Sequence, residues 1–230
     1  MIEIEIFSDV ICPWCFIGKA RLDAVMQTPV GEGISLRWRP YQLQPQIPLE
    51  GLDRSLYLTR RYGPQADLAK VPERIVQEAE AEGLKLRYDL IERMPNTRLA
   101  HQVLSFAFPY GVQHTLAQIL FEAYFCHGVD IGDLSRLMTA AKKVGLPEEP
   151  LRVYLAENQG LAEIEQQRER AVDLGVSGVP GYYFADRFLL PGAQDQETMK
   201  QIIQRVKDLS LIHISEPTRQ YCQSRMPSSA

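Results

Sequence analysis

Cys12-Pro13-Trp14-Cys15 is the stretch that decides the fold of this chain, because it joins two segments of different periodicity. In the preceding run, Ile2 to Phe7, apolar residues alternate strictly with carboxylates, which is typical of a half-buried strand. The segment after the motif is compatible with a helix, so Cys12 is predicted to lie where that helix begins. Free backbone N–H groups and the helix dipole stabilise an anion there, and we expect the Cys12 thiol to ionise more easily than an ordinary thiol.

The motif itself favours redox chemistry over two structural alternatives. Pro13 suits a first helical position, and Cys15 falls on the same face one turn after Cys12, within reach of a mixed disulfide formed there. A zinc site would need further ligands, but Cys126 and Cys222 have no partner at ligand spacing, so we expect no metal. A permanent structural disulfide suits small secreted domains better than a chain of 230 residues without an apparent secretory signal.

Composition limits the class of protein and its partners. The chain is 45% hydrophobic and 23% charged, enough to bury a core without disulfides. Its net charge is -4 with no basic block, so we expect no nucleic-acid partner. No run of about 18 apolar residues is present, so we expect no membrane span and a cytoplasmic location. In that compartment a C-x-x-C pair is more often catalytic than structural.

The order of predicted elements gives an α/β fold with a helical insertion. A second strand is predicted at Ile34 to Arg39, and a Gly-Val-Ser-Gly-Val-Pro-Gly loop from Gly175 precedes a strand hairpin and a last helix, Gln196 to Leu209. The predicted helices between these parts are Arg54 to Tyr62, Pro72 to Glu82, Thr97 to Phe108, Gln113 to Phe125, Asp133 to Gly145, Pro147 to Tyr154 and Leu161 to Leu174. The chain is thus divided into a domain made of 1–51 and 175–209, an insertion at 52–174, and a tail at 210–230.

This plan resembles the thioredoxin fold, and several motifs resemble the DsbA family of thiol-disulfide oxidoreductases, in particular its FrnE-like branch. The matching segments are Phe7 to Lys19 around the cysteines, Trp38-Arg39-Pro40-Tyr41-Gln42-Leu43, Pro95-Asn96-Thr97 with His101, Asp130-Ile131-Gly132-Asp133, and Gly175 to Pro180. The resemblance implies that the Val179-Pro180 bond is cis and faces the cysteines. Such a loop exposes the backbone of Val179 to an extended substrate.

The same resemblance leaves a second function open. The related 2-hydroxychromene-2-carboxylate isomerases and kappa-class glutathione transferases share the insertion and the Val-Pro loop, but those isomerases carry serine in place of Cys12. An intact Cys12/Cys15 pair favours disulfide exchange, because serine cannot form a disulfide. Asn96 resembles a substrate-binding position of the isomerase branch, with helix capping beside Thr97 as the alternative. His101 is interpreted as a packed helix residue, and Asp9 as a turn residue that is also a candidate proton acceptor.

The resemblance also implies that the insertion lies over the active-site face and walls a groove between itself and Pro180. We expect this groove to be mostly apolar, with Trp14 and Tyr41 as its aromatic floor; Tyr41 in the core is the alternative. The tail from Ser210 resembles the translated read-through of a sequencing adaptor, with a genuine variable tail as the alternative, and we expect it to be non-native and disordered.

The sequence therefore predicts a cytoplasmic dithiol-disulfide oxidoreductase in which Cys12 and Cys15 are catalytic. Pro13, Trp14, Asn96, Val179 and Pro180 are the candidate substrate-binding residues. No bound cofactor is expected, with glutathione a candidate co-substrate. The partner is a disulfide-bearing or thiol-bearing protein or small molecule. The sequence leaves the substrate, the direction of electron transfer and the oligomeric state open.

Overall fold

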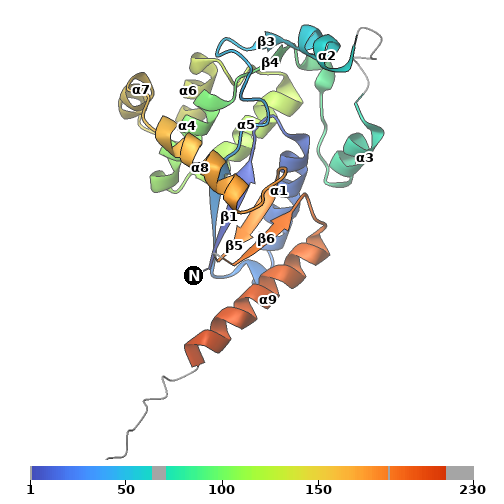
Figure 1. Cartoon of the computed structure of the whole chain (residues 1–230), viewed down its shortest axis with the longest axis vertical. Helices are drawn as coiled ribbons and strands as arrows, with labels where there is room; N and C mark the ends of the chain where they lie inside the picture. The colour runs from blue at the N-terminus through green and yellow to red at the C-terminus, as the bar shows by residue number, and fades with distance from the viewer. Residues whose placement is uncertain (1, 64–70, 186, 216–230) are drawn as a thin grey trace, which may run out of the picture.

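Strand β1 (Ile2–Ser8) lies inside a four-stranded sheet that is assembled from both ends of the chain (Figure 1). The computed structural model describes residues 2–63, 71–185 and 187–215. The other strands of this sheet are β2 (Ile34–Pro40), β5 (Gly181–Phe184) and β6 (Phe188–Pro191), in the order β2-β1-β5-β6. β1 is parallel to β2 and antiparallel to β5, and β5 and β6 form the predicted hairpin.

Helices α1 and α9 pack together beside this sheet. Helix α1 (Pro13–Met26) follows the Cys12 motif, and α9 (Gln196–Ser215) contacts it. α9 is longer than predicted, since it runs six residues past the expected end at Leu209 into the segment assigned to the tail. The physical reason is that no glycine or proline interrupts the chain before Pro217, so the backbone hydrogen bonding continues. The rest of the tail, 216–230 with Cys222, lies outside the described residues.

The insertion is helical, as predicted, and covers one end of the sheet (Figure 1). Its helices are α2 (Arg54–Tyr62), α3 (Glu73–Ala81), α4 (Arg98–Ala107), α5 (Gln113–His127), α6 (Leu134–Lys143), α7 (Glu148–Ala156) and α8 (Leu161–Asp173). Short 3₁₀ helices span Pro29–Gly31, Tyr88–Leu90 and Phe108–Tyr110. α4 and α5 contact each other through their apolar faces, and both also contact β2.

One small sheet was not predicted. Strands β3 (Leu52–Asp53) and β4 (Arg93–Met94) pair as antiparallel neighbours within the insertion. Two-residue strands carry no alternation, so no sequence pattern distinguishes them from loops. Their pairing holds the start of α2 next to the segment that precedes α4.

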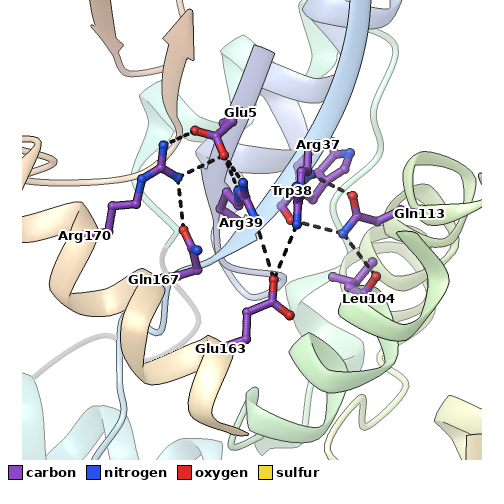
Figure 2. Close-up of polar contacts among 9 residues, drawn as sticks. All are labelled: Glu5, Arg37, Trp38, Arg39, Leu104, Gln113, Glu163, Gln167 and Arg170. Atoms are coloured by element: carbon purple, nitrogen blue, oxygen red, sulfur yellow. Dashed lines mark hydrogen bonds and ion pairs between the residues drawn. The ribbon is translucent and has the colours of Figure 1, made fainter. Parts of the chain in front are cut away.

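Glu5 of β1 does not lie where the alternating pattern placed it. In a half-buried strand the carboxylates that alternate with apolar residues are expected to face solvent. The Glu5 side chain is buried, because α8 covers that face of the sheet. Arg39 of β2 and Arg170 of α8 both form ion pairs with the Glu5 carboxylate, and one Arg170 hydrogen bond to Oε1 is 2.9 Å long (Figure 2). Arg39 also reaches Glu163 of α8 at 3.7 Å. These charges fasten the last helix of the insertion to the sheet.

Candidate active site

Cys12 lies between the end of β1 and the start of α1, as predicted. It is the residue that precedes the helix, with φ -93° and ψ 115°, and Pro13 follows as the first helical residue. The Cys12 carbonyl accepts hydrogen bonds from the backbone N–H of Cys15 at 3.1 Å and of Phe16 at 3.3 Å. The first turn of the helix therefore holds the two cysteines on one face.

Both cysteines are free thiols and both are nearly enclosed. Cys12 is 4% exposed and Cys15 is 1% exposed. Burial, reinforced by the adjacent Cys12, raises the pKa of the Cys15 thiol well above its usual range, although the Ser8 hydroxyl and the Asp9 backbone partly oppose this. A thiol in this state stays protonated at neutral pH, so it needs a proton acceptor before it can attack another sulfur.

The loop before β5 brings a second chain segment to Cys12. The Val179-Pro180 peptide bond is cis, as the family resemblance implied. The Cys12 Sγ lies 3.6 Å from the Val179 carbonyl oxygen and donates a hydrogen bond to it. Gly18 of α1 permits this close packing, because a Cβ there would lie 3.1 Å from Pro180 Cγ and 2.4 Å from the Tyr182 hydroxyl. The structure thus brings Cys12, Val179 and Pro180 together.

Asp9 and His101 form a buried pair beneath the cysteines. Asp9 is fully buried, its Oδ2 accepts from the Leu43 backbone N–H at 2.7 Å, and its Oδ1 lies 3.4 Å from His101 Nε2. Ser8 and His101 line a cavity of about 10 Å³, roughly the space that one water occupies. The contact between Asp9 Oδ1 and His101 Nε2 lacks hydrogen-bond geometry, so these two atoms and Ser8 Oγ are buried without a hydrogen-bond partner. Because unpaired buried polar atoms are rare, this cluster is suited to hold a water or a moving proton.

His101 is packed within its helix, as its sequence context indicated, but sequence reasoning missed that it faces Asp9. Both residues belong to segments that carry the family resemblance. Because about 90 residues separate them in the sequence, no local pattern indicated that Asp9 and His101 are in contact.

The side chain of Asn96 forms hydrogen bonds with neighbouring groups of the protein. Its side chain is 7% exposed, its Oδ1 accepts from the Arg98 N–H at 2.9 Å and from Gln42 Nε2 at 3.2 Å, and its Nδ2 donates to the Ile47 carbonyl at 2.5 Å. Asn96 does not occupy the capping position of α4, because Thr97 is the residue directly before the helix and makes no side-chain capping hydrogen bond. Asn96 instead accepts from the first helical N–H, at Arg98, from one residue further back. A substrate contact by Asn96 stays a prediction.

Replacing Asn96 by alanine is expected to lower the free energy of unfolding by about 1–3 kcal/mol, because buried partners at Ile47 and Arg98 would be left unpaired. Urea denaturation measures this loss, with the exposed Gln46→Ala as a neighbouring control. Unchanged stability together with weakened substrate turnover would instead assign Asn96 to substrate binding.

A pocket of about 220 Å³ opens beside Pro13. It lies between the active-site loop, α2 and the segments that carry Tyr88 and Tyr124. The residues that line it are Ile11, Pro13, Leu43, Gln44, Arg54, Tyr57, Leu58, Arg61, Tyr62, Tyr88, Met94, Tyr124 and Phe125. The insertion therefore walls a pocket beside Pro13, but Val179 and Pro180, which were expected on the other side of the groove, do not line it, and its aromatic residues are not the expected ones.

Neither of the two residues expected on the floor of the groove lines this pocket. Trp14 is half-buried, and the Arg74 guanidinium lies 5.5 Å from its ring centre, away from the pocket lining. Tyr41 packs against the cluster of Phe7, Ala171 and Val176, which is the core alternative. The two aromatics adjoin the motif in sequence, but the pocket wall comes from helices whose placement no local pattern specifies.

The described residues contain neither a metal-binding cluster nor a membrane-spanning helix. Across residues 2–63, 71–185 and 187–215, no group of three or more histidine, cysteine or carboxylate side chains could hold a metal ion. No helix in this described part of the chain has the length and apolar character needed to cross a membrane.

The mixed sheet, the dithiol before α1 and the proline loop define a thioredoxin-like protein with a dithiol site. A model of the DSBA-like thioredoxin domain matches residues 3–204, so the chain belongs to that family. The expected fold and the expected class of enzyme, a DsbA-like thiol-disulfide oxidoreductase, are thereby confirmed.

Individual proteins that are similar to this chain also include DsbA-like proteins. The chain is 25% identical over 204 residues to the uncharacterized protein YwbO of Bacillus subtilis (strain 168), covering 88% of this chain and 96% of that protein. It is similar to the probable DsbA oxidoreductase SCO1869 from Streptomyces coelicolor, with a TM-score of 0.80, 26% identity and coverage of 100% and 94% of the two chains. The cytosolic disulfide reductase DsbM from Pseudomonas aeruginosa with GSH has a TM-score of 0.62, 16% identity and coverage of 93% and 100%, which shows the fold alone.

Proposed function

We propose that this protein is a cytoplasmic dithiol-disulfide oxidoreductase in which Cys12 attacks a substrate disulfide and Cys15 resolves the mixed disulfide. The observation that carries the proposal is the approach of Cys12 Sγ to the Val179 carbonyl, since it joins a nucleophile to a backbone edge that an extended substrate could pair with. The cytosolic relative DsbM supports the compartment.

The chemistry follows from the two different thiols. The Cys12 thiolate attacks one sulfur of the substrate disulfide, the substrate S–S bond breaks, and one substrate thiolate leaves. Cys15 then loses its proton and attacks the Cys12 sulfur, which releases the second substrate thiolate and forms the Cys12-Cys15 disulfide. Two electrons pass from the cysteine pair to the substrate. The reverse sequence oxidises a substrate dithiol.

Reduction of insulin disulfides in the presence of a dithiol tests this proposal, together with oxidation of a reduced test protein. The wild-type protein is expected to perform at least one of the two. If it performs neither, and instead accelerates a glutathione-dependent isomerisation, the isomerase alternative replaces the proposal.

Glutathione is the candidate co-substrate, supported by the DsbM structure with GSH. One glutathione thiolate would attack the Cys12-Cys15 disulfide, which gives a mixed disulfide and one free cysteine thiol. A second glutathione thiolate would attack the glutathione sulfur of that mixed disulfide, which releases oxidised glutathione and returns the protein to the dithiol form. Thiol recovery after addition of reduced glutathione, followed by alkylation and mass spectrometry, measures this step. A pair that recovers with a dithiol but not with glutathione would remove glutathione from the cycle.

We expect Asp9→Asn to slow resolution by Cys15 about tenfold while it leaves attack by Cys12 nearly unchanged. In our proposal the Cys15 proton passes by way of Ser8 and the small cavity to the Asp9-His101 pair, and an amide at position 9 cannot accept it. Rapid-mixing experiments separate the two steps, because the first thiolate is released on attack and the second on resolution.

The control for this test is Asp23→Asn, which removes a half-buried carboxylate on α1 that pairs with Lys19 and His114. Equal slowing of both steps by Asp9→Asn would mean that Asp9 shapes the active site as a whole. No slowing of either step would remove Asp9 from proton transfer.

A further inference from the structure

The pocket beside Pro13 is positively charged. The charged side chains that line it are Arg54 and Arg61, both from α2, and no carboxylate belongs to the described residues of its wall. This sign is opposite to that of the whole chain, whose net charge is -4. A positive site on a negative protein is a local feature of the pocket, and such a site raises the local concentration of anions.

Aromatic side chains hold the two arginines in place. The Arg54 guanidinium lies 5.6 Å from the centre of the Tyr88 ring, and Arg61 Nε donates to the Tyr62 hydroxyl at 3.3 Å. Burial, together with the charge on Cys12, raises the pKa of Tyr88, so its phenol stays neutral. The pocket therefore combines flat apolar faces, a phenol hydroxyl and two cations.

A third cation lies on the other side of the motif. Arg74 of α3 is stacked over Trp14 at 5.5 Å, and α3 is fastened to α1 by ion pairs from Arg21 to Glu78 and, at 2.7 Å, to Glu82. Arg74 also forms an ion pair with Glu78 at 3.8 Å, so its charge is balanced within α3. The positive charge that a substrate meets beside Pro13 therefore comes from the arginines of the pocket wall.

The volume limits what can fit. At about 220 Å³ the pocket is smaller than typical ligand pockets, which span roughly 300–1,000 Å³. It has room for one ring and a carboxylate, but not for a large molecule. We propose that the pocket binds one half of a small disulfide, an aromatic thiol that carries a carboxylate, with the ring against the tyrosines and the carboxylate on Arg54 and Arg61. This inference rests on the proposed function of the cysteines.

In this proposal the bound half exchanges at Cys12, which directly precedes the pocket residue Pro13 and interacts electrostatically with Tyr88 of the pocket wall. The Cys12 thiolate bonds to one sulfur of the small disulfide, and the S–S bond breaks to release an aromatic thiolate. Cys15 then displaces the second aromatic thiolate, so that the cysteine pair is oxidised and the disulfide is reduced to two thiolates. A dithiol such as dithiothreitol returns the enzyme to its reduced form.

The test compares a charged and a neutral aromatic disulfide on the pre-reduced full chain. The probes are 5,5′-dithiobis(2-nitrobenzoate), which carries a carboxylate on each ring, and 4,4′-dithiodipyridine, which carries none. Arg61→Gln is expected to lower the rate with the carboxylate probe about fivefold, in line with the loss of one exposed charge interaction, and to leave the neutral probe nearly unchanged. Added salt should weaken the wild-type preference in the same direction.

Arg60→Gln is the matched control, because Arg60 is an exposed neighbour on α2 that does not line the pocket. It changes the net charge equally but should leave both rates close to those of the wild type. Equal rate losses for both probes in Arg61→Gln, or equal losses in Arg60→Gln and Arg61→Gln, would overturn the pocket assignment.

A second measurement separates this inference from the proposed function. Benzoate contains no sulfur, and it is expected to protect Cys12 from iodoacetamide in the wild type more strongly than benzamide does, with the difference lost in Arg54→Gln and Arg61→Gln. Such protection without any disulfide exchange would overturn the proposed function and keep the pocket. Exchange without selective protection by benzoate would overturn the pocket and keep the function.

Discussion

Replacing Cys12 by serine is expected to abolish disulfide exchange, lowering the rate of insulin reduction by at least about 1,000-fold to the level of the assay without enzyme. A serine hydroxyl is protonated at neutral pH and cannot form a disulfide, so both the attack on substrate and the internal disulfide are lost. The variant should fold normally, because serine is close in size and the position lies at the start of α1. Circular dichroism and thermal unfolding check this point.

Two further cysteine variants make the result specific. Cys126→Ser removes a thiol from α5 away from the motif, and it should retain the wild-type rate. Cys15→Ser should instead accumulate a mixed disulfide on Cys12, which can be isolated from cell extract to identify the substrate. Substantial exchange by Cys12→Ser would show that another thiol is the nucleophile.

Glu5→Gln is expected to lower the free energy of unfolding by about 3–5 kcal/mol, as for other buried ion pairs that lose one partner. Glu5 is 4% exposed, and its carboxylate neutralises Arg39 and Arg170, which would remain beside an uncharged amide (Figure 2). Urea denaturation of the two proteins measures the difference. Glu3→Gln is the matched control, because Glu3 lies on the same strand but is exposed, and its loss should change stability little.

The same group predicts how stability depends on pH. Burial alone would raise the pKa of Glu5, but hydrogen bonds and charges from Arg170 and Arg39 outweigh it, and the net pKa lies below the usual 4.5. A carboxyl with a lowered pKa in the folded state adds stability above pH 4.5, and this contribution is lost as the pH falls through the folded pKa. Glu5→Gln should therefore lose less stability than the wild type on acidification below pH 4.5. Parallel acid profiles for the two proteins would contradict this assignment.

Local patterns predicted the elements that carry the dithiol. The alternation of Ile2 to Phe7 and the change of pattern after Cys12 are properties of adjacent residues, so the sequence alone specified β1 and the start of α1. Periodicity likewise predicted the helices of the insertion within a few residues. The cis form of Val179-Pro180 needed the family resemblance, because most X-Pro bonds are trans.

Interactions between distant segments could not be predicted in the same way. Glu5 has the sequence context of an exposed strand residue, and only the placement of α8 makes it a buried partner of Arg170. The Asp9-His101 pair and the arginines beside Pro13 likewise depend on how the insertion packs against the motif. Tyr41 and Trp14 were misassigned for the same reason, since closeness in sequence was taken as closeness to the pocket.

A redox titration of the Cys12-Cys15 pair decides whether these two cysteines exchange electrons as one dithiol-disulfide couple. The full-length protein is equilibrated in glutathione buffers of graded redox poise, free thiols are alkylated after acid quenching, and mass spectrometry counts the labels on Cys12 and Cys15. We expect the protein to carry two labels, on Cys12 and Cys15, in reducing buffers and no label on either cysteine in oxidising buffers, with a single two-electron transition between the two states. Cys12→Ser should show no such transition. A pair that stays a disulfide in the most reducing buffer, or that gains only a glutathione adduct on Cys12 in the most oxidising one, would contradict this expectation.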